Sequence, residues 1–213
     1  GEEGLPGGRV KFLQDLDGDG FYETATLFLD GLPYPTGMMP WGDGVLICSA
    51  PDILYAVDTD GDGRADQVET WFTGFAKDNF QARVNGLTYG LDGWIYGANG
   101  LLGGVIQGAP GTPPVDIRGR DFRFHPVTRV LEPVSGLTQQ GRVRDDFGNW
   151  FGSDNGTFAW HYPLAERYLA RNPHVAPPQL RVSVAKSPGV FPTSRTLERF
   201  NNPDHTNRAT GTC

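Results

Sequence analysis

Asp/Gly turns recur along the chain, and each of them leads into a short run of apolar and aromatic residues. The clearest copies contain Asp43, Asp92 and Asp146, which are 49 and 54 residues apart. Asp-Gly pairs favour tight hairpin turns, because glycine readily adopts the positive φ that such turns need. This repeat constrains the fold more than any other feature, since each copy predicts one small β element.

A second kind of hairpin is interleaved with the first. Residues 9–32 and 52–75 each read as a strand, an acidic Asp-Gly loop and another strand, and the loops begin 43 residues apart at Asp15 and Asp58. A further hairpin over 121–132 lacks the acidic loop. An inner strand pair followed by an outer hairpin, repeated at roughly 40–55 residues, is typical of a four-stranded propeller blade.

The predicted fold is therefore all-β, a partial β-propeller of about three blades of four-stranded antiparallel sheet that forms a single unit over residues 1–213. We expect a short helix near 163–171, where the only helical apolar period occurs. Within the same unit, residues 157–213 are rich in Pro and Arg and are expected to form a largely irregular extension. A β-sandwich remains the alternative, although it does not predict a regular repeat of this length.

Composition excludes several classes of protein. A chain with 12% aromatic residues can bury a core and is not expected to be disordered. A net charge of −7 disfavours nonspecific binding to nucleic acid, and no apolar stretch is long enough to cross a membrane. The two cysteines, Cys48 and Cys213, lack the spacing of a metal or haem site, and whether they pair is left open.

The two acidic loops predict calcium sites, because calcium takes six to eight oxygen ligands and both loops alternate three Asp before a Gly. The predicted ligands are Asp15, Asp17, Asp19, Glu23 and the carbonyl of Phe21 in the first loop, and Asp58, Asp60, Asp62, Asp66, Glu69 and the carbonyl of Arg64 in the second. Glu69 occupies the twelfth loop position, where the first loop has Thr26, so the second site is expected to bind more tightly. The alternative is that these loops are simply good hairpin turns.

Catalytic groups are scarce. No His lies in a nucleophile or zinc-protease motif. His125 is expected in a hairpin turn and His174 and His205 at the surface, whereas His161, after Trp160, is a candidate for a cleft.

Arg83 and Asn85 precede the strand at Asp92, which in a propeller would put them at the mouth of the central channel. They are candidates for recognising an anionic or carbonyl-bearing ligand there, or alternatively for capping turns.

Many segments in order along the chain resemble the propeller domain of the planctomycete-type membrane-bound dehydrogenases. The matching segments are 9–20, 31–37, 50–55, 83–87, 94–100, 119–124, 166–169 and 191–200. These proteins are similar to quinoprotein glucose and sorbosone dehydrogenases. The resemblance implies an exported protein (periplasmic, cell-surface or secreted), oxidation of a sugar or alcohol with pyrroloquinoline quinone, and a c-type cytochrome domain as partner.

The same resemblance implies that further propeller blades come from sequence beyond this chain or from another chain. It also puts Ala82, or Arg83 after a slip of one residue, where the quinoprotein enzymes have a His general base. Alanine cannot accept a proton, so Arg83 and His161 are the remaining catalytic candidates. The alternative function is a non-catalytic, calcium-stabilised propeller that binds a glycan or a protein partner.

Overall fold

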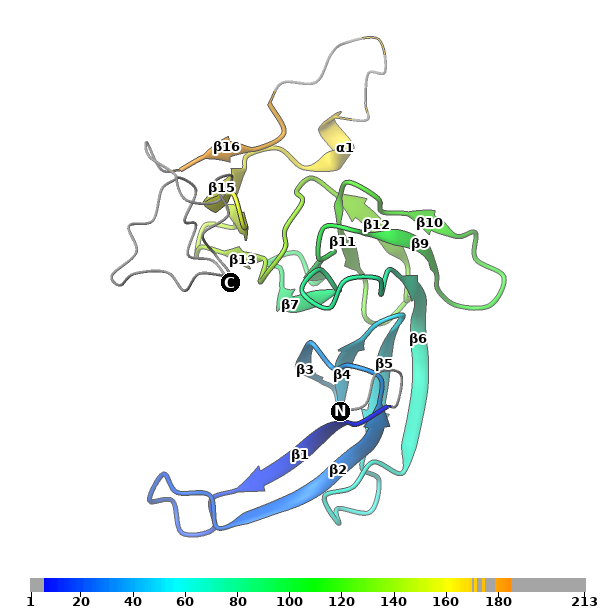
Figure 1. The fold of residues 1–213 in the computed structure, drawn as a ribbon, viewed down its shortest axis with the longest axis vertical. Helices are drawn as coiled ribbons and strands as arrows, with labels where there is room; N and C mark the ends of the chain where they lie inside the picture. The colour runs from blue at the N-terminus through cyan, green and yellow to red at the C-terminus, as the bar shows by residue number, and fades with distance from the viewer. Residues whose placement is uncertain (1–5, 170, 172–173, 175–178, 185–213) are drawn as a thin grey trace, which may run out of the picture.

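Antiparallel β-strands are the main regular structure of the described chain, which in this computed structural model comprises residues 6–169, 171, 174 and 179–184 (Figure 1). The first two strands, β1 (Gly8–Gln14) and β2 (Thr24–Leu32), form a long hairpin of their own. The prediction of an all-β chain is confirmed.

Three larger sheets follow along the chain. The first is six-stranded, in the order β10 (Val115–Asp116), β9 (Gly104–Gln107), β6 (Gln67–Phe75), β5 (Asp52–Val57), β4 (Gly44–Ser49) and β3 (Gly37–Trp41). The second is four-stranded, in the order β12 (Leu131–Val134), β11 (Asp121–Phe124), β8 (Ile95–Ala98) and β7 (Asn85–Tyr89). The third, also four-stranded, is ordered β13 (Val143–Arg144), β14 (Trp150–Asp154), β15 (Thr157–Tyr162) and β16 (Val182–Ser183).

The main core lies between the first and second sheets. Phe72 and Phe75 from β6 pack against Phe124 and Phe122 from β11, with ring centroids 4.9 and 5.1 Å apart. All four side chains are fully or almost fully buried. Aromatic residues supply much of this core because each ring removes a large apolar area from water.

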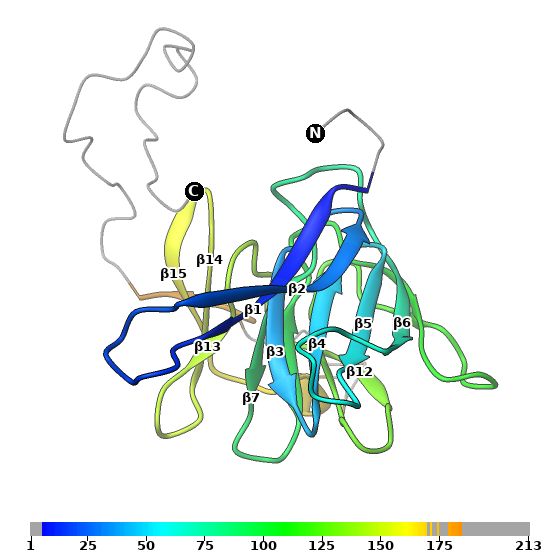
Figure 2. The same ribbon diagram turned by 90° about the horizontal axis from the view of Figure 1, so that it is seen from below.

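A smaller core attaches the first hairpin. Val10 and Leu32 from the hairpin pack with Ile47 and Ala56, which lie on β4 and β5. Figure 2 shows β1 and β2 lying across this part of the six-stranded sheet. The hairpin therefore has its own apolar contact with the sheet that follows it in sequence.

The described part of the extension expected from residue 157 contains regular structure, and residues 185–213 of that extension lie outside the described residues. Residues 157–162 form β15, because Asp154 accepts hydrogen bonds from the amides of Gly156 and Thr157 and so closes a tight turn after β14. β16 then pairs with β15. The predicted helix near 163–171 is present as one short turn, α1 (Glu166–Leu169).

The Gly/Pro-rich insertion over 101–117 also forms strands. β9 and β10 make a hairpin that pairs with the outer edge of β6. Edge strands expose unpaired amides and carbonyls, so this hairpin covers an edge that would otherwise be open to another chain. Within the described residues, no helix has the length and apolar character needed to cross a membrane.

Candidate functional site

The first acidic loop joins β1 to β2 and is held by hydrogen bonds from its own backbone. Asp15 accepts from the amide of Gly18 at 2.7 Å through Oδ1 and from the amide of Gly20 at 2.9 Å through Oδ2. Glu23 closes the loop by accepting from the amide of Leu16 at 2.6 Å. These contacts turn carboxylates from both ends of the loop toward one another.

The second loop joins β5 to β6 and repeats this pattern position by position. Asp58 accepts from the amides of Gly61 and Gly63, each at 2.8 Å. Asp66, at the position of Glu23, accepts from the amide of Thr59 at 2.7 Å. The hydrogen bond from the Thr59 amide lowers the pKa of Asp66 most, and the hydrogen bond from the Thr59 hydroxyl lowers it further. Both keep this carboxyl ionised.

Glycine is required at two positions of each loop. The residues with positive φ are Gly18, Gly20, Gly61 and Gly63, with φ of 79°, 91°, 83° and 84°. Only glycine takes up this left-handed conformation without a steric penalty. The two loops thus share both their hydrogen bonds and their backbone path.

Carboxylate oxygens gather in both loops. In the first, one ligand atom from each of four residues lies within 4.8 Å of all the others, and these residues are Asp15, Asp17, Asp19 and Glu23. In the second, three residues meet the same condition, and they are Asp58, Asp60 and Asp66. The first loop therefore gathers more carboxylates than the second, and the expected tighter binding at the second loop stays a prediction.

Two predicted ligands of the second loop have other partners. Oδ2 of Asp62 lies 3.9 Å from Nε of Arg64. The position of Arg64 is occupied in the first loop by Phe21, which is uncharged and cannot pair with Asp19. Glu69 forms a two-pronged ion pair with Arg129 at 2.5 and 2.8 Å. Arg129 is the main cause that lowers the pKa of Glu69.

The amides of Phe21 and Arg64 donate to Asp19 Oδ1 and Asp62 Oδ1 at 2.7 and 2.8 Å. Both residues therefore occupy the same place in their loops. Ligation through their carbonyls stays a prediction.

The second loop also contacts the first hairpin. The amide of Ala65 donates to the carbonyl of Phe28 in β2 at 2.9 Å. A Cβ added at Gly63 would lie 3.2–3.3 Å from Thr26 and Phe12. The second loop is therefore a joint between the hairpin and the six-stranded sheet.

Asn85 is fully engaged within the protein. Its amide nitrogen donates to the carbonyls of Arg83 and Gln139, and its Oδ1 accepts from the amide of Gly141. These bonds join the start of β7 to the segment that enters the third sheet. The geometry favours the turn-capping alternative for this residue over ligand recognition.

Arg83 is 7% exposed and lies between two aromatic rings. Its guanidinium carbon is 4.9 Å from the ring centre of Tyr34 and 4.5 Å from that of Phe80, and its Nη2 donates to the carbonyl of Lys77. Ala82, beside it, is buried. The segment thus holds an arginine clamped by stacking and hydrogen bonding.

The His residues form no catalytic constellation in the described part of the chain. His161, on β15, stacks on Phe151 with ring centres 5.1 Å apart, and its Nε2 is buried without a hydrogen-bond partner. His125 accepts amide hydrogen bonds within its turn, as expected. His174 lies in the short described stretch after β15, and His205 falls outside the described residues.

Cys48 is buried in β4, and burial raises the pKa of its thiol to about 12. A thiol with this pKa is unreactive near neutral pH. Cys213 lies outside the described residues, so pairing between the two stays untested.

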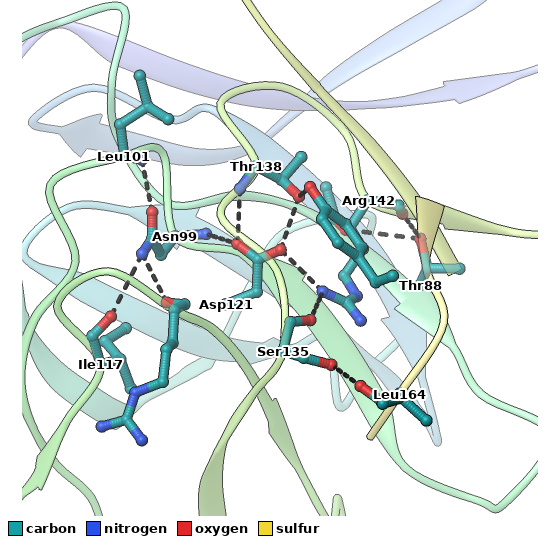
Figure 3. Close-up of polar contacts among 12 residues, drawn as sticks. Thr88, Asn99, Leu101, Ile117, Asp121, Ser135, Thr138, Arg142 and Leu164 are labelled. Carbon is teal, nitrogen blue, oxygen red and sulfur yellow. Dashed lines mark hydrogen bonds and ion pairs between the residues drawn. The ribbon is translucent and has the colours of Figure 1, made fainter. Parts of the chain in front are cut away.

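A buried ion pair that no sequence pattern predicts lies near the junction of the second and third sheets (Figure 3). Asp121 and Arg142 have side chains that are 0% and 2% exposed and 2.8 Å apart. Asp121 also accepts from the amides of Asn99 and Thr138 and from the Thr138 hydroxyl. All these partners are distant in sequence, so no local motif announces them.

A family model described as "Domain of unknown function (DUF7133)" matches residues 1–213. No curated protein matches the chain, and neither does any solved structure.

Proposed function

The chain belongs to the DUF7133 family, and we propose that it is an exported β-propeller module, stabilised by calcium at two acidic loops, that acts by binding rather than by oxidation. The observation that carries the proposal is the position-by-position equivalence of the loops at 15–23 and 58–66. A hairpin needs only one Asp and one Gly to turn. Two loops that each draw several carboxylates together have a feature that turn formation does not require.

Electrostatics support a cation at these loops. Carboxylates held within 4.8 Å of one another repel, and a bound cation would relieve this repulsion. Oxygen ligands from a flexible loop suit calcium better than magnesium, which demands a stricter octahedral site. The exposure of both loops fits the modest affinities of extracellular calcium modules, which agrees with an exported protein.

The propeller arrangement is supported by the order of the strands. Three sets of four successive strands, apart from the β9–β10 insertion, each pair in chain order from first to last. The first strands of two successive sets, β3 and β7, also contact each other. Adjacent first strands are what a propeller requires, because they surround its axis. The β1–β2 hairpin then corresponds to the outer half of a further blade.

The chemistry of the expected quinone site argues against oxidation by this module. Ala82 offers no base, both polar ends of the Asn85 amide are used, and Arg83 is clamped between rings. The position that the resemblance assigns to the general base, at Ala82 or Arg83, therefore does not fit that role, and Asn85 has little left to offer a ligand. We propose that an attached c-type cytochrome domain, where present, would carry redox chemistry without help from this segment.

Calorimetric titration of the full chain with calcium tests the proposal. We expect saturable binding to two sites. Asp60→Asn should weaken one site at least about tenfold, because it removes a ligand charge but keeps an oxygen to accept the Asp62 amide. Asp17→Asn is the matched change in the first loop and should affect the other site.

Two results would overturn the account. If the chain binds no calcium, the alternative interpretation holds, and the acidic loops are ordinary hairpin turns. Reduction of a dye by the quinone-treated chain, over a panel of sugars and alcohols, would show that the module is a dehydrogenase after all.

A further inference from the structure

A pocket of about 610 Å³ lies where the second sheet meets the third. Its lining comes from the turn after β7, the turn between β13 and β14, the strand β12, and the segment that runs from Tyr162 through α1. Neither acidic loop contributes to it. Its size is in the range of small-molecule sites, which bury most of a ligand of a few rings.

The polar lining has no net charge. The ionisable residues around the pocket are three acids and three bases, namely Asp92, Glu132, Glu166, Arg123, Arg142 and Arg167. Arg123 pairs with both Asp92 and Glu132, at 2.9 and 2.8 Å. The lining therefore offers both donors and acceptors, and neither sign of charge dominates.

Arg142 supplies hydrogen-bond donors that the protein does not use. Its Nη1 donates to Asp121 and to the carbonyl of Ser135. Its Nε is buried without an acceptor, and Nη2 makes no hydrogen bond within the described part of the chain. The guanidinium also lies against the aromatic lining of the pocket, since its carbon is 4.9 Å from the ring centre of Trp150 and 5.0 Å from that of Tyr162.

Exposed apolar groups surround the same pocket. Phe147, Leu91 and Tyr168 are 89%, 64% and 55% exposed, and all three belong to its lining. Further in, Trp150 stacks on Tyr96 with ring centres 4.1 Å apart. Large apolar side chains kept in water around a pocket mark a binding surface more often than a structural one.

We propose that this pocket binds a neutral carbohydrate. Each sugar hydroxyl both donates and accepts, which matches a lining that contains carboxylates and guanidiniums in equal number. The apolar C–H faces of a sugar ring pack on aromatic side chains such as Phe147 and Tyr168. A strongly anionic ligand would meet as many acids as bases, and a wholly apolar ligand would leave the charged lining unsatisfied.

The inference deepens the proposed binding function, on which it rests, by naming the surface and the ligand class. The test is fluorescence titration of the full chain in calcium with cellotetraose, xylotetraose, laminaritetraose and mannotetraose, following the combined emission of its five Trp, of which Trp150 lines the pocket. Tetragalacturonate serves as the charged comparison. We expect saturable binding of at least one neutral tetrasaccharide and weaker binding of tetragalacturonate.

Two pocket variants locate the site. Phe147→Ala and Tyr168→Ala should each weaken binding about fivefold or more, and both alter exposed side chains that the fold does not need. Val127→Ala is the matched control, because Val127 is 73% exposed and lies outside the pocket. It should leave the affinity unchanged.

Three outcomes would overturn the proposal: no binding of any neutral tetrasaccharide, preference for tetragalacturonate, or binding that Phe147→Ala and Tyr168→Ala leave intact. Calorimetry with calcium on the same samples separates the two claims. Calcium binding without sugar binding would reject only the pocket, and sugar binding without calcium binding would reject only the acidic loops.

Discussion

Single residues decide how far two equivalent loops can differ. The same Asp-Gly pattern produces the same hydrogen bonds in both loops. The seventh position, however, holds Phe21 in one and Arg64 in the other. In the second loop, the guanidinium of Arg64 lies beside Asp62 and competes for its carboxylate.

Arg64→Phe should therefore strengthen calcium binding at the second loop. The change removes a positive charge near the site and frees Asp62, so we expect the affinity to rise about tenfold. Calorimetry on the variant, alongside Phe21→Ala in the first loop, measures this effect. An affinity that Arg64→Phe leaves unchanged would mean that Asp62 is not a ligand.

The buried pair of Asp121 and Arg142 is the residue-scale feature on which stability depends most. Asp121→Asn would leave Arg142 as a buried charge without its partner and turn an amide toward the Thr138 hydroxyl, which should cost about 3–5 kcal/mol. Urea unfolding measures the loss. Asp116→Asn, which alters the exposed pair of Asp116 and Arg118, is the control and should change stability little. Equal effects would contradict the importance of burial.

At the scale of the element, the hairpins could be predicted from the sequence because they depend on local chemistry. Pairing between strands that are distant in sequence could not be predicted. Asp-Gly turns gave the positions of β3 to β8 and of the β1–β2 hairpin, because a turn depends on neighbouring residues. β9 and β10 were not predicted, because β9 pairs with β6 across a long separation in sequence and β10 pairs with β9 within a Gly/Pro-rich stretch.

The same limit applies to the candidate site. The Asp spacing predicted the grouped carboxylates, because they lie within single loops. The ion pair that takes Glu69 away from its predicted role as a ligand is formed with Arg129, 60 residues away in sequence. No pattern along the chain reveals this pair.

The pair of Glu69 and Arg129 joins β6 to the turn between β11 and β12, and its contribution should depend on pH. Arg129 lowers the pKa of Glu69 in the folded chain. A depressed carboxyl pKa adds stability above the unfolded value of about 4.3 and loses it as pH falls through the folded value. Glu69→Gln should therefore lower the urea midpoint at pH 7 and have less effect near pH 3. An effect that is equal at both pH values would rule out the charge as its cause.

On the scale of the whole molecule, the loop at 58–66 connects parts that the chain order separates. It lies between β5 and β6 and also contacts β2 through Ala65 and Phe28. A calcium ion there would hold the β1–β2 hairpin against the six-stranded sheet, whose shared core is small. The main aromatic core, between β6 and β11, contains no residue of this loop, so it would not depend directly on the calcium ion.

Calcium removal should consequently loosen the molecule unevenly. With a chelator, we expect faster amide hydrogen exchange at Ala65 and along β2, while β8 and β11 stay protected. Mass spectrometry of the exchanged peptides measures this difference. Uniform loosening of all sheets, or none, would contradict a joint at the second loop.

The paired calcium loops are the central claim, and anomalous diffraction tests them most directly. Crystals of the chain grown with calcium should give two anomalous difference peaks, one among Asp15, Asp17, Asp19 and Glu23 and one among Asp58, Asp60 and Asp66. Well-ordered loops without an anomalous peak in either would contradict the account.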